Sequence, residues 1–184
     1  MALVVFLRGV NIGGHRVFRP SALPAQLPEL GVVNIGAAGT FVVRRRVGRA
    51  ELRRAFRRQL PFAAEIVVCD GAQVRALMAD DLFAGLRLRP GMVRFVSILS
   101  GAPKVAPHLP IGLPAGRRWL VKLIARTDCF VAGVYRRNMK TIGYLGRIDR
   151  LFDVALTTRN WNTFMAIARV LDASRGLAIS SACN

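Results

Sequence analysis

The residues best suited to chemistry in this chain are arginines. Eight of them lie between Arg44 and Arg58, where Glu51 is the only acid. A run of guanidinium groups suits the phosphate backbone of a nucleic acid, because each group bonds phosphate oxygens and releases counterions. The structural alternative is a solvated helix face, but such faces usually mix charges to gain pairs four residues apart. We therefore predict nucleic-acid-binding residues at Arg44, Arg45, Arg46, Arg49, Arg53, Arg54, Arg57 and Arg58.

A glycine-rich turn near the start of the chain is a second candidate. Its sequence is Leu7-Arg-Gly-Val-Asn-Ile-Gly-Gly14, and backbone N–H groups in such a turn can form an anion-binding nest. It lacks the Lys-Ser/Thr pair of a P-loop and the spacing of a dinucleotide fingerprint, so nucleotide hydrolysis is not expected. The alternative is a tight turn that needs glycine for its geometry. The ligand-binding candidates here are Arg8, Asn11, Gly13 and Gly14.

The segment Thr157-Thr-Arg-Asn-Trp-Asn-Thr163 is the third candidate. Apolar residues at helical spacing from Trp161 onward predict a helix that begins near Asn160, with Thr158 or Asn160 as its cap. A helix start beside an arginine suits a phosphate or carboxylate, and a tryptophan can stack on a base. The alternative is a capped helix with a core tryptophan. The ligand-binding candidates here are Arg159, Asn160, Trp161 and Asn162.

Catalytic and metal-binding groups are scarce. His15 and His108 are the only histidines, and no Ser-His-Asp or Cys-His order can be singled out. Asp149 and Asp153 stand four residues apart beside arginines, which favours a surface ion-pair cluster over a metal site. We therefore assign no catalytic residue, no metal and no cofactor, and the sequence favours a binding protein over an enzyme.

The three cysteines, Cys69, Cys129 and Cys183, are far apart and odd in number. This excludes a disulfide framework and a paired-cysteine metal site, and it is typical of the reducing cytoplasm. No stretch reaches the roughly 18 apolar residues that a membrane helix needs. We expect a cytoplasmic protein with no membrane partner.

The composition indicates a folded, strongly basic chain. Of its 184 residues, 53% are hydrophobic, which is enough for a core at this length. Lys and Arg number 28 against 10 Asp and Glu, a formal charge of +18, and this imbalance favours an anionic partner such as nucleic acid. With 25 Arg and 3 Lys, codon usage in a GC-rich genome is an alternative source of the arginines, although it does not explain the shortage of acids.

These candidates belong to a pattern of strands and helices that predicts an α+β fold. In the first half, strands are predicted at Leu3–Leu7, Val32–Ile35, Phe41–Val43 and Ala64–Cys69, with a short or broken helix at Ser21–Leu30 and helices at Arg49–Leu60 and Asp70–Met78. In the second half, strands are predicted at Val93–Leu99, Trp119–Ile124 and Phe130–Tyr135, a loop at Gly101–Gly116, and helices at Ile148–Asp153 and Asn160–Asp172. The order in the first half is ferredoxin-like, βαββαβ. We predict two subdomains, a ferredoxin-like one at 1–85 and a mixed α+β unit ending in a helix at 91–184.

Two of these segments also carry a family resemblance. The start Leu7–Gly14 and the later Thr157–Thr163 resemble the LRGINVGG and TRNWNT motifs of the bacterial family called Domain of Unknown Function 1697. The resemblance extends over nearly the whole chain, including the paired strands around Gly39 and the stretch Phe95–Ser100. It implies an architecture of two α+β subdomains and no particular activity.

The chain departs from the family pattern at three places. It has Ala37-Ala-Gly-Thr40 where the family usually shows Gln-Ser-Gly-Asn, and His15 where the family favours Lys. Gly146-Arg147 is followed by Ile148-Asp149 in place of Ser-Lys. If those polar residues carry a function in the family, this chain has altered it.

Two functions of different classes fit these observations. The leading hypothesis is a small basic binding protein for an anionic, phosphate-bearing ligand such as nucleic acid. The rival is an enzyme or small-molecule pocket between the two subdomains, its reaction unknown, lined by Arg8, Asn11, Arg159, Asn160 and Asn162. A third interpretation is an interaction protein that dimerises through its sheet edges.

Overall fold

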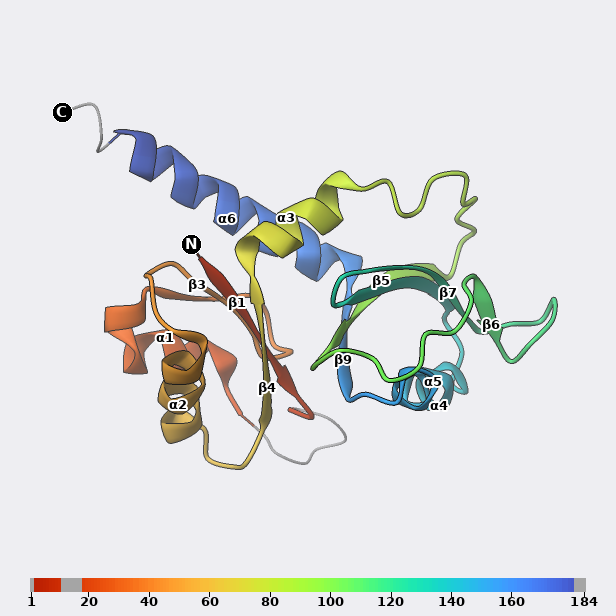
Figure 1. Ribbon diagram of the computed structural model, residues 1–184, viewed down its shortest axis with the longest axis horizontal. Helices are drawn as coiled ribbons and strands as arrows, with labels where there is room; N and C mark the ends of the chain where they lie inside the picture. The colour runs from red at the N-terminus through yellow and green to blue at the C-terminus, as the bar shows by residue number, and fades with distance from the viewer. Residues whose placement is uncertain (1, 11–17, 181–184) are drawn as a thin grey trace. The chain divides into compact units, whose positions relative to one another are not determined.

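The computed structural model describes residues 2–10 and 18–180, with side chains described up to residue 173. The chain forms two compact units, one of residues 1–78 with 162–184 and the other of residues 79–161. Each unit combines an antiparallel sheet with helices (Figure 1), which confirms the predicted α+β class.

The first unit is built on a four-stranded antiparallel sheet in the order β2-β3-β1-β4. Its strands are β1 (Leu3–Arg8), β2 (Val32–Asn34), β3 (Thr40–Val43) and β4 (Glu65–Asp70). The central strand β1 is buried from Leu3 to Leu7, because all five residues are apolar and both faces of the sheet are covered. The chain order strand, helix, strand, strand, helix, strand is as predicted, while the ferredoxin-like name for it stays an interpretation.

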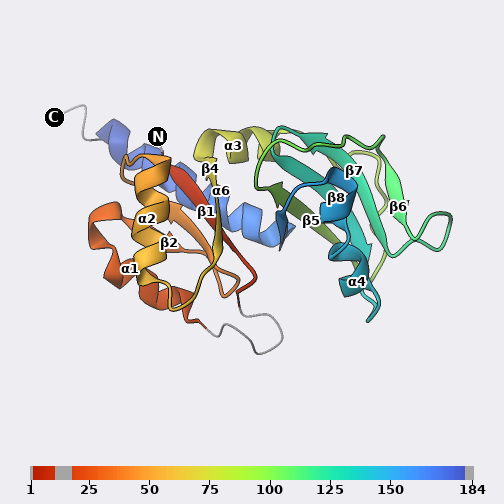
Figure 2. The same cartoon turned by 60° about the horizontal axis from the view of Figure 1, so that its bottom comes forward.

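Two helices cover one face of this sheet. The short α1 (Leu23–Gln26) lies between the 3-10 turns Pro20–Ala22 and Pro28–Leu30, and the prolines explain why this helix is broken, as predicted. The longer α2 (Arg49–Gln59) buries Leu52 and Phe56. Both helices contribute to one core on the same face of the sheet (Figure 2), and the ring of Phe56 meets Phe41 edge-to-face at 5.4 Å.

The opposite face of the same sheet carries the C-terminal helix. Helix α6 (Trp161–Ser180) places Phe164 on Phe6 of β1, with ring centroids 5.9 Å apart. Leu171 packs over Gly71, the first residue of α3 (Gly71–Ala79), where an added Cβ would lie 2.9 Å from Leu171 Cδ2. The C-terminal helix therefore belongs to the first unit, and the compact units differ in this respect from the predicted subdomains 1–85 and 91–184.

The second unit is a five-stranded antiparallel sheet in the order β6-β7-β8-β5-β9. Its strands are β5 (Met92–Leu99), β6 (Ile111–Leu113), β7 (Val121–Thr127), β8 (Phe130–Arg136) and β9 (Leu156–Asn160), and its helices are α4 (Thr141–Leu145) and α5 (Ile148–Phe152). Ile148 and Phe152 pack on one face of the sheet against Phe95 and Leu99.

Two strands of this sheet differ from the prediction. The edge strand β6 lies inside the predicted loop Gly101–Gly116. It was not predicted, because three residues between prolines are too few to show an alternation of apolar and polar side chains. The edge strand β9 covers residues that the sequence placed just before the C-terminal helix. It was not predicted as a strand, because its polar sequence shows no alternation of apolar and polar side chains. Within the described residues, no helix combines the length and the apolar character that a bilayer crossing requires.

Candidate anion-binding site

The arginine run follows β3 and continues along α2. Arg44, Arg45 and Arg46 are exposed in the connection between the two elements. On α2, the buried stripe faces the sheet, and this leaves Arg54, Arg57 and Arg58 exposed on the opposite side of the helix. Arg49 is exposed as well, but it is paired with Asp70. We call the other six exposed arginines of the run, Arg44, Arg45, Arg46, Arg54, Arg57 and Arg58, the α2 arginine surface.

Two arginines of the run bind the neighbouring strand. Arg49 donates to the carboxylate of Asp70 at 2.5 Å and to the carbonyl oxygen of Val68 at 3.3 Å. Arg53 Nε donates to the carbonyl oxygen of Ile66 in a long bond of 3.4 Å. All three acceptors belong to β4, which is an edge strand of the sheet. Arg49 and Arg53 therefore satisfy backbone oxygens that a further strand would otherwise bind.

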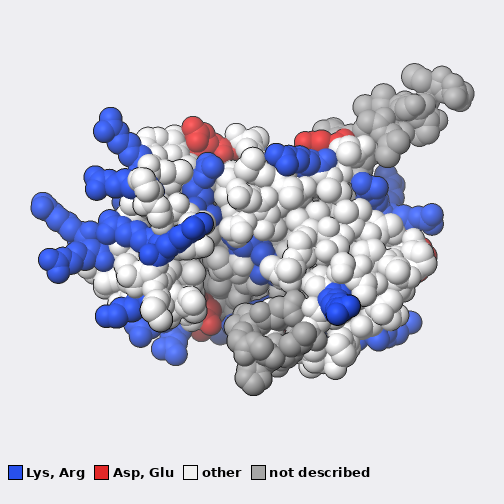
Figure 3. Space-filling model, turned by 180° about the vertical axis from the view of Figure 1, so that it is seen from behind, with Lys and Arg blue, Asp and Glu red and all other residues white. Residues whose placement is uncertain are grey.

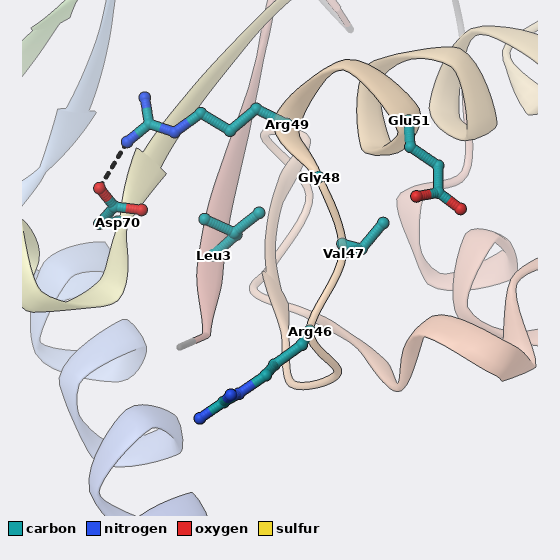
Figure 4. A pocket seen from close by; sticks show the side chains of 7 residues that line it. All are labelled: Leu3, Arg46, Val47, Gly48, Arg49, Glu51 and Asp70. Atoms are coloured by element: carbon teal, nitrogen blue, oxygen red, sulfur yellow. Dashed lines mark hydrogen bonds and ion pairs between the residues drawn. The ribbon is translucent and has the colours of Figure 1, made fainter.

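A hollow of about 570 Å³ lies where α2 begins. Figure 4 shows that Arg46 and Arg49 extend to the same side of the segment that leads into the helix, while Glu51 points to the other side. Gly48 is the N-cap residue and provides no side-chain hydrogen bond to the first turn. The positive end of the helix and two guanidinium groups thus border one hollow, with Asp70 as a paired carboxylate on its wall.

A smaller hollow of about 320 Å³ lies elsewhere in the first unit. Its lining includes Arg19, Ser21 and Asn34. Among the described residues, Oδ1 of Asn34 is buried without a hydrogen-bond partner. No observation connects this hollow to the arginine run.

The acids of the first unit are mostly engaged. This unit contains fourteen Lys and Arg against five Asp and Glu, a formal charge of +9. Glu65 pairs with Arg8 at 2.9 Å, Asp70 with Arg49, and Asp172 with Arg75 at 3.9 Å. Among the residues that the structure describes, none of the six arginines of the α2 arginine surface is in an ion pair.

The N-terminal motif is described only in part. Arg8, at the end of β1, forms its ion pair with Glu65 on β4, while Asn11, Gly13 and Gly14 lie outside the described residues. The N–H of Leu7 donates to the carbonyl oxygen of Gly39 at 2.8 Å. Gly39 has a φ of +70°, and a Cβ there would lie 3.0 Å from Leu7 Cβ. Gly39 in the β2–β3 turn is thus hydrogen-bonded to Leu7, the first residue of the motif, and packs closely against it.

The C-terminal motif divides between a strand and a helix. The strand β9 ends at Asn160 and α6 begins at Trp161, so the predicted helix start is right to within one residue. The hydroxyl of Thr158 is hydrogen-bonded to that of Ser97 across the sheet at 2.7 Å. Asn160 and Asn162 are exposed.

Arg159 is only 7% exposed. One guanidinium nitrogen donates to Thr157 Oγ1 at 2.8 Å and to the Thr158 carbonyl oxygen at 2.9 Å. Burial lowers the pKa of Arg159 to about 10, so the group is still protonated at neutral pH. Its described contacts therefore hold it against its own strand, and they do not present it to a ligand in solution.

Trp161 is partly buried in a cluster within the second unit. Its ring meets Phe83 edge-to-face at 5.1 Å, and the guanidinium of Arg94 lies 5.6 Å from the ring centroid. These contacts agree with the structural alternative of a packed tryptophan. The predicted ligand role of Trp161 stays a prediction.

The part of the chain that the structure describes contains no group of three or more His, Cys, Asp or Glu side chains arranged to hold a metal ion. Cys69 is buried and Cys129 is partly buried.

Comparison with known proteins places these features in a family. The chain is similar in structure to a conserved bacterial protein from Streptococcus pneumoniae, with 13% sequence identity, a TM-score of 0.56, and coverage of 92% of this chain and 98% of that one. At this identity the similarity concerns the fold alone. No curated protein matches the chain. The family model described as Protein of unknown function (DUF1697) matches residues 1–109. Since this match covers more than half of the 184 residues, the chain belongs to the DUF1697 family, as its motifs predicted.

Proposed function

We propose that this protein binds a phosphate-bearing anion, most simply a nucleic acid, through the α2 arginine surface. One observation carries the proposal: seven of the arginines from Arg44 to Arg58 are exposed, and for six of them no carboxylate of the described residues forms an ion pair. Uncompensated cations that lie close together raise the local concentration of polyanions. Each contact with a backbone phosphate then releases counterions, which is the main source of non-specific nucleic-acid affinity.

The two remaining arginines of the predicted set have a supporting role in this proposal. Arg53 is bonded to β4 and is only partly exposed. Arg49 is bonded to Asp70 at the border of the larger hollow. Their contacts fix α2 against the sheet edge, so that the outward arginines are presented from a rigid element.

The other predictions about the site stay predictions. In the predicted ligand-binding set, Arg8, Asn11, Arg159, Asn160 and Asn162 line the pocket of the rival hypothesis, an enzyme or small-molecule site. In the leading hypothesis, the Gly13-Gly14 turn and the helix start at Thr158–Thr163, which includes Trp161, would orient the phosphates. The burial of Arg159 and the ion pair of Arg8 do not favour that hypothesis. We also propose a cytoplasmic location, supported by the small number and wide spacing of the cysteines.

The test is charge reversal on α2. A variant with Arg54→Glu, Arg57→Glu and Arg58→Glu is compared with the wild type by fluorescence anisotropy, using labelled single-stranded and double-stranded oligonucleotides. Three lost charge-assisted contacts at about 1 kcal/mol each correspond to a roughly hundredfold loss of affinity. The helix should persist, because all three side chains are exposed.

A matched control separates a local effect from one of net charge. The variant Arg126→Glu, Arg150→Glu and Arg169→Glu changes the net charge by the same amount at exposed positions outside the run. We expect this control to lose much less affinity than the α2 variant. Equal losses in both variants would mean that binding follows overall charge, and unchanged affinity in the α2 variant would contradict the proposal.

A further inference from the structure

A second cationic surface lies on the second unit, at one end of the β7–β8 pair. The N–H of Arg136 donates to the carbonyl oxygen of Leu120 at 2.8 Å, so the residues before β7 lie beside the end of β8. Arg117 and Arg118 are exposed just before this point, and Arg137 and Lys140 are exposed just after β8. Figure 3 shows Lys and Arg side chains projecting from the end of the second unit that carries β6, at the left of the view.

Acidic residues are scarce in the sequence around this surface. Asp128 is the only Asp or Glu between Leu82 and Ile148. It lies in the β7–β8 turn, at the far end of a seven-residue strand, roughly 20 Å along β7. The second unit as a whole contains fourteen Lys and Arg against five acids. The cations at this end of the sheet are therefore not compensated locally.

An aromatic ring stands among these cations. The guanidinium carbon of Arg136 lies 4.3 Å from the ring centroid of Trp119, which is a close cation–π contact. Nε of Arg136 is buried without a hydrogen-bond partner, and no carboxylate among the described residues pairs with the group. Trp119 itself remains partly exposed. A flat, cation-backed ring and several free cations thus lie together.

We propose that this surface binds single-stranded nucleic acid, and we call it the Trp119 surface, formed by Arg117, Arg118, Trp119, Arg136, Arg137 and Lys140. The exposed cations contact phosphates, and an unpaired base packs on the Trp119 ring. Single strands are specified because only unpaired bases offer a free face for stacking. The inference rests on the proposed function, since both need a nucleic-acid ligand, but it concerns a different unit and different residues.

An anionic membrane is the competing partner for such a surface. Met139 is 95% exposed between Arg137 and Lys140, and cations beside exposed apolar side chains also suit anionic lipid headgroups. The arrangement favours nucleic acid. The contact with Arg136 holds the Trp119 ring in place beside the strand end, as a flat surface on which a base can stack.

The direct test uses the fluorescence of the two tryptophans in the chain. The wild type and a Trp119→Phe variant are titrated with single-stranded oligo(dT), with a duplex, and with inorganic polyphosphate as a probe that has charge but no bases. We expect saturable quenching by oligo(dT) in the wild type, loss of that quenching in the variant, and no quenching by polyphosphate. Quenching that persists in Trp119→Phe would come from Trp161 and would overturn the inference.

A second variant keeps the inference testable if Trp119 is needed for folding. Arg117→Glu with Arg118→Glu changes two exposed residues, and Arg126→Glu with Arg150→Glu is the control of equal charge. We expect the first pair to weaken oligo(dT) binding by roughly tenfold or more and the control pair to weaken it much less. Equal effects would overturn the inference. So would binding to phosphatidylserine vesicles that Arg117→Glu with Arg118→Glu abolishes while oligo(dT) affinity is unchanged.

These binding experiments distinguish a failure of this inference from a failure of the proposed function. If no oligonucleotide binds in anisotropy, both fail together. If oligo(dT) binds and only the α2 variant loses affinity, with no change at Trp119, then the proposed function stands and the Trp119 surface is rejected.

Discussion

The guanidinium of Arg49 bonds the carboxylate of Asp70 at 2.5 Å, between the first turn of α2 and the last residue of β4. This pair divides a run of arginines that the sequence presents as uniform. Arg49 and Arg53 bind the edge strand, while the six residues of the α2 arginine surface have no such partner. The division decides which substitutions test binding and which test the fold.

Replacing Asp70 by Asn should strengthen anion binding. The change removes a negative charge from the hollow and releases Arg49, and a unit charge about 4 Å away is worth about 1 kcal/mol in water, or roughly fivefold in affinity. The loss of stability should stay below about 1 kcal/mol, because the two side chains are 44% and 32% exposed. Oligonucleotide anisotropy measures the first effect and urea unfolding the second. Asp172→Asn, with the same charge change at another pair, should leave affinity nearly unchanged, and a weaker complex of Asp70→Asn would contradict this account.

Gly39→Ala should destabilise the first unit. Gly39 has a φ of +70°, and its new Cβ would lie 3.0 Å from Leu7 and 3.1 Å from Val10. The left-handed backbone alone costs a non-glycine residue about 1–2 kcal/mol, and the contacts add to this. Gly36→Ala is the control, because Gly36 has a φ of +71° but nothing within 4 Å of the added atom. Chemical unfolding should show the larger loss for Gly39→Ala, and equal losses would mean that the packing on Leu7 is unimportant.

Gly133→Ala should be among the most damaging single substitutions in the second unit. The added Cβ would lie 2.6 Å from the Lys122 carbonyl oxygen and 2.6 Å from Phe95 Cζ, inside a paired sheet. Phe95 is fully buried and cannot move aside, so we expect a loss of about 3 kcal/mol. Gly143→Ala in α4 meets nothing within 4 Å and should be neutral or stabilising by about 0.5–1 kcal/mol. Thermal unfolding compares them, and a tolerated Gly133→Ala would show that β8 does not pack as described.

Phe164→Ala tests whether the C-terminal helix completes the first unit. Phe164 is fully buried and stacks on Phe6, so truncation should cost about 3–5 kcal/mol. Met165, the next residue, is exposed, and Met165→Ala should cost less than about 0.5 kcal/mol. The two variants are compared by urea unfolding. A small effect of Phe164→Ala would place α6 outside the core.

Local patterns predicted the elements whose own residues determine them. The predicted helix Arg49–Leu60 and the observed α2, Arg49–Gln59, agree because its apolar stripe, its arginines and the following Pro61 all lie within one segment. The prolines in Ser21–Leu30 likewise predicted the broken helix around α1. The strand β9 was missed because its assignment depends on pairing with β5, where Phe95 faces Asn160. A periodicity within one segment cannot reveal a strand partner that lies 65 residues away in the sequence.

The candidate site was predictable in composition but not in geometry. The sequence showed that residues 44–58 are basic, but the contacts of Arg49 with Asp70 and of Arg53 with Ile66 join segments that only the fold brings together. The Trp119 surface was not predicted at all. Its one signal was the sequence Arg117-Arg118-Trp119, and the second half of the surface comes from the strand that pairs with β7.

The most direct test of the proposed function is a salt series of oligonucleotide binding on the wild type and on Arg54→Glu, Arg57→Glu, Arg58→Glu. For single strands, the logarithm of affinity falls with the logarithm of salt concentration by about 0.7 per phosphate contact. If these three arginines contact phosphates, the slope of the variant should be shallower by about 2. A wild type that shows no binding at low salt, or a variant with the slope of the wild type, would contradict the account of the α2 arginine surface as a phosphate-binding site.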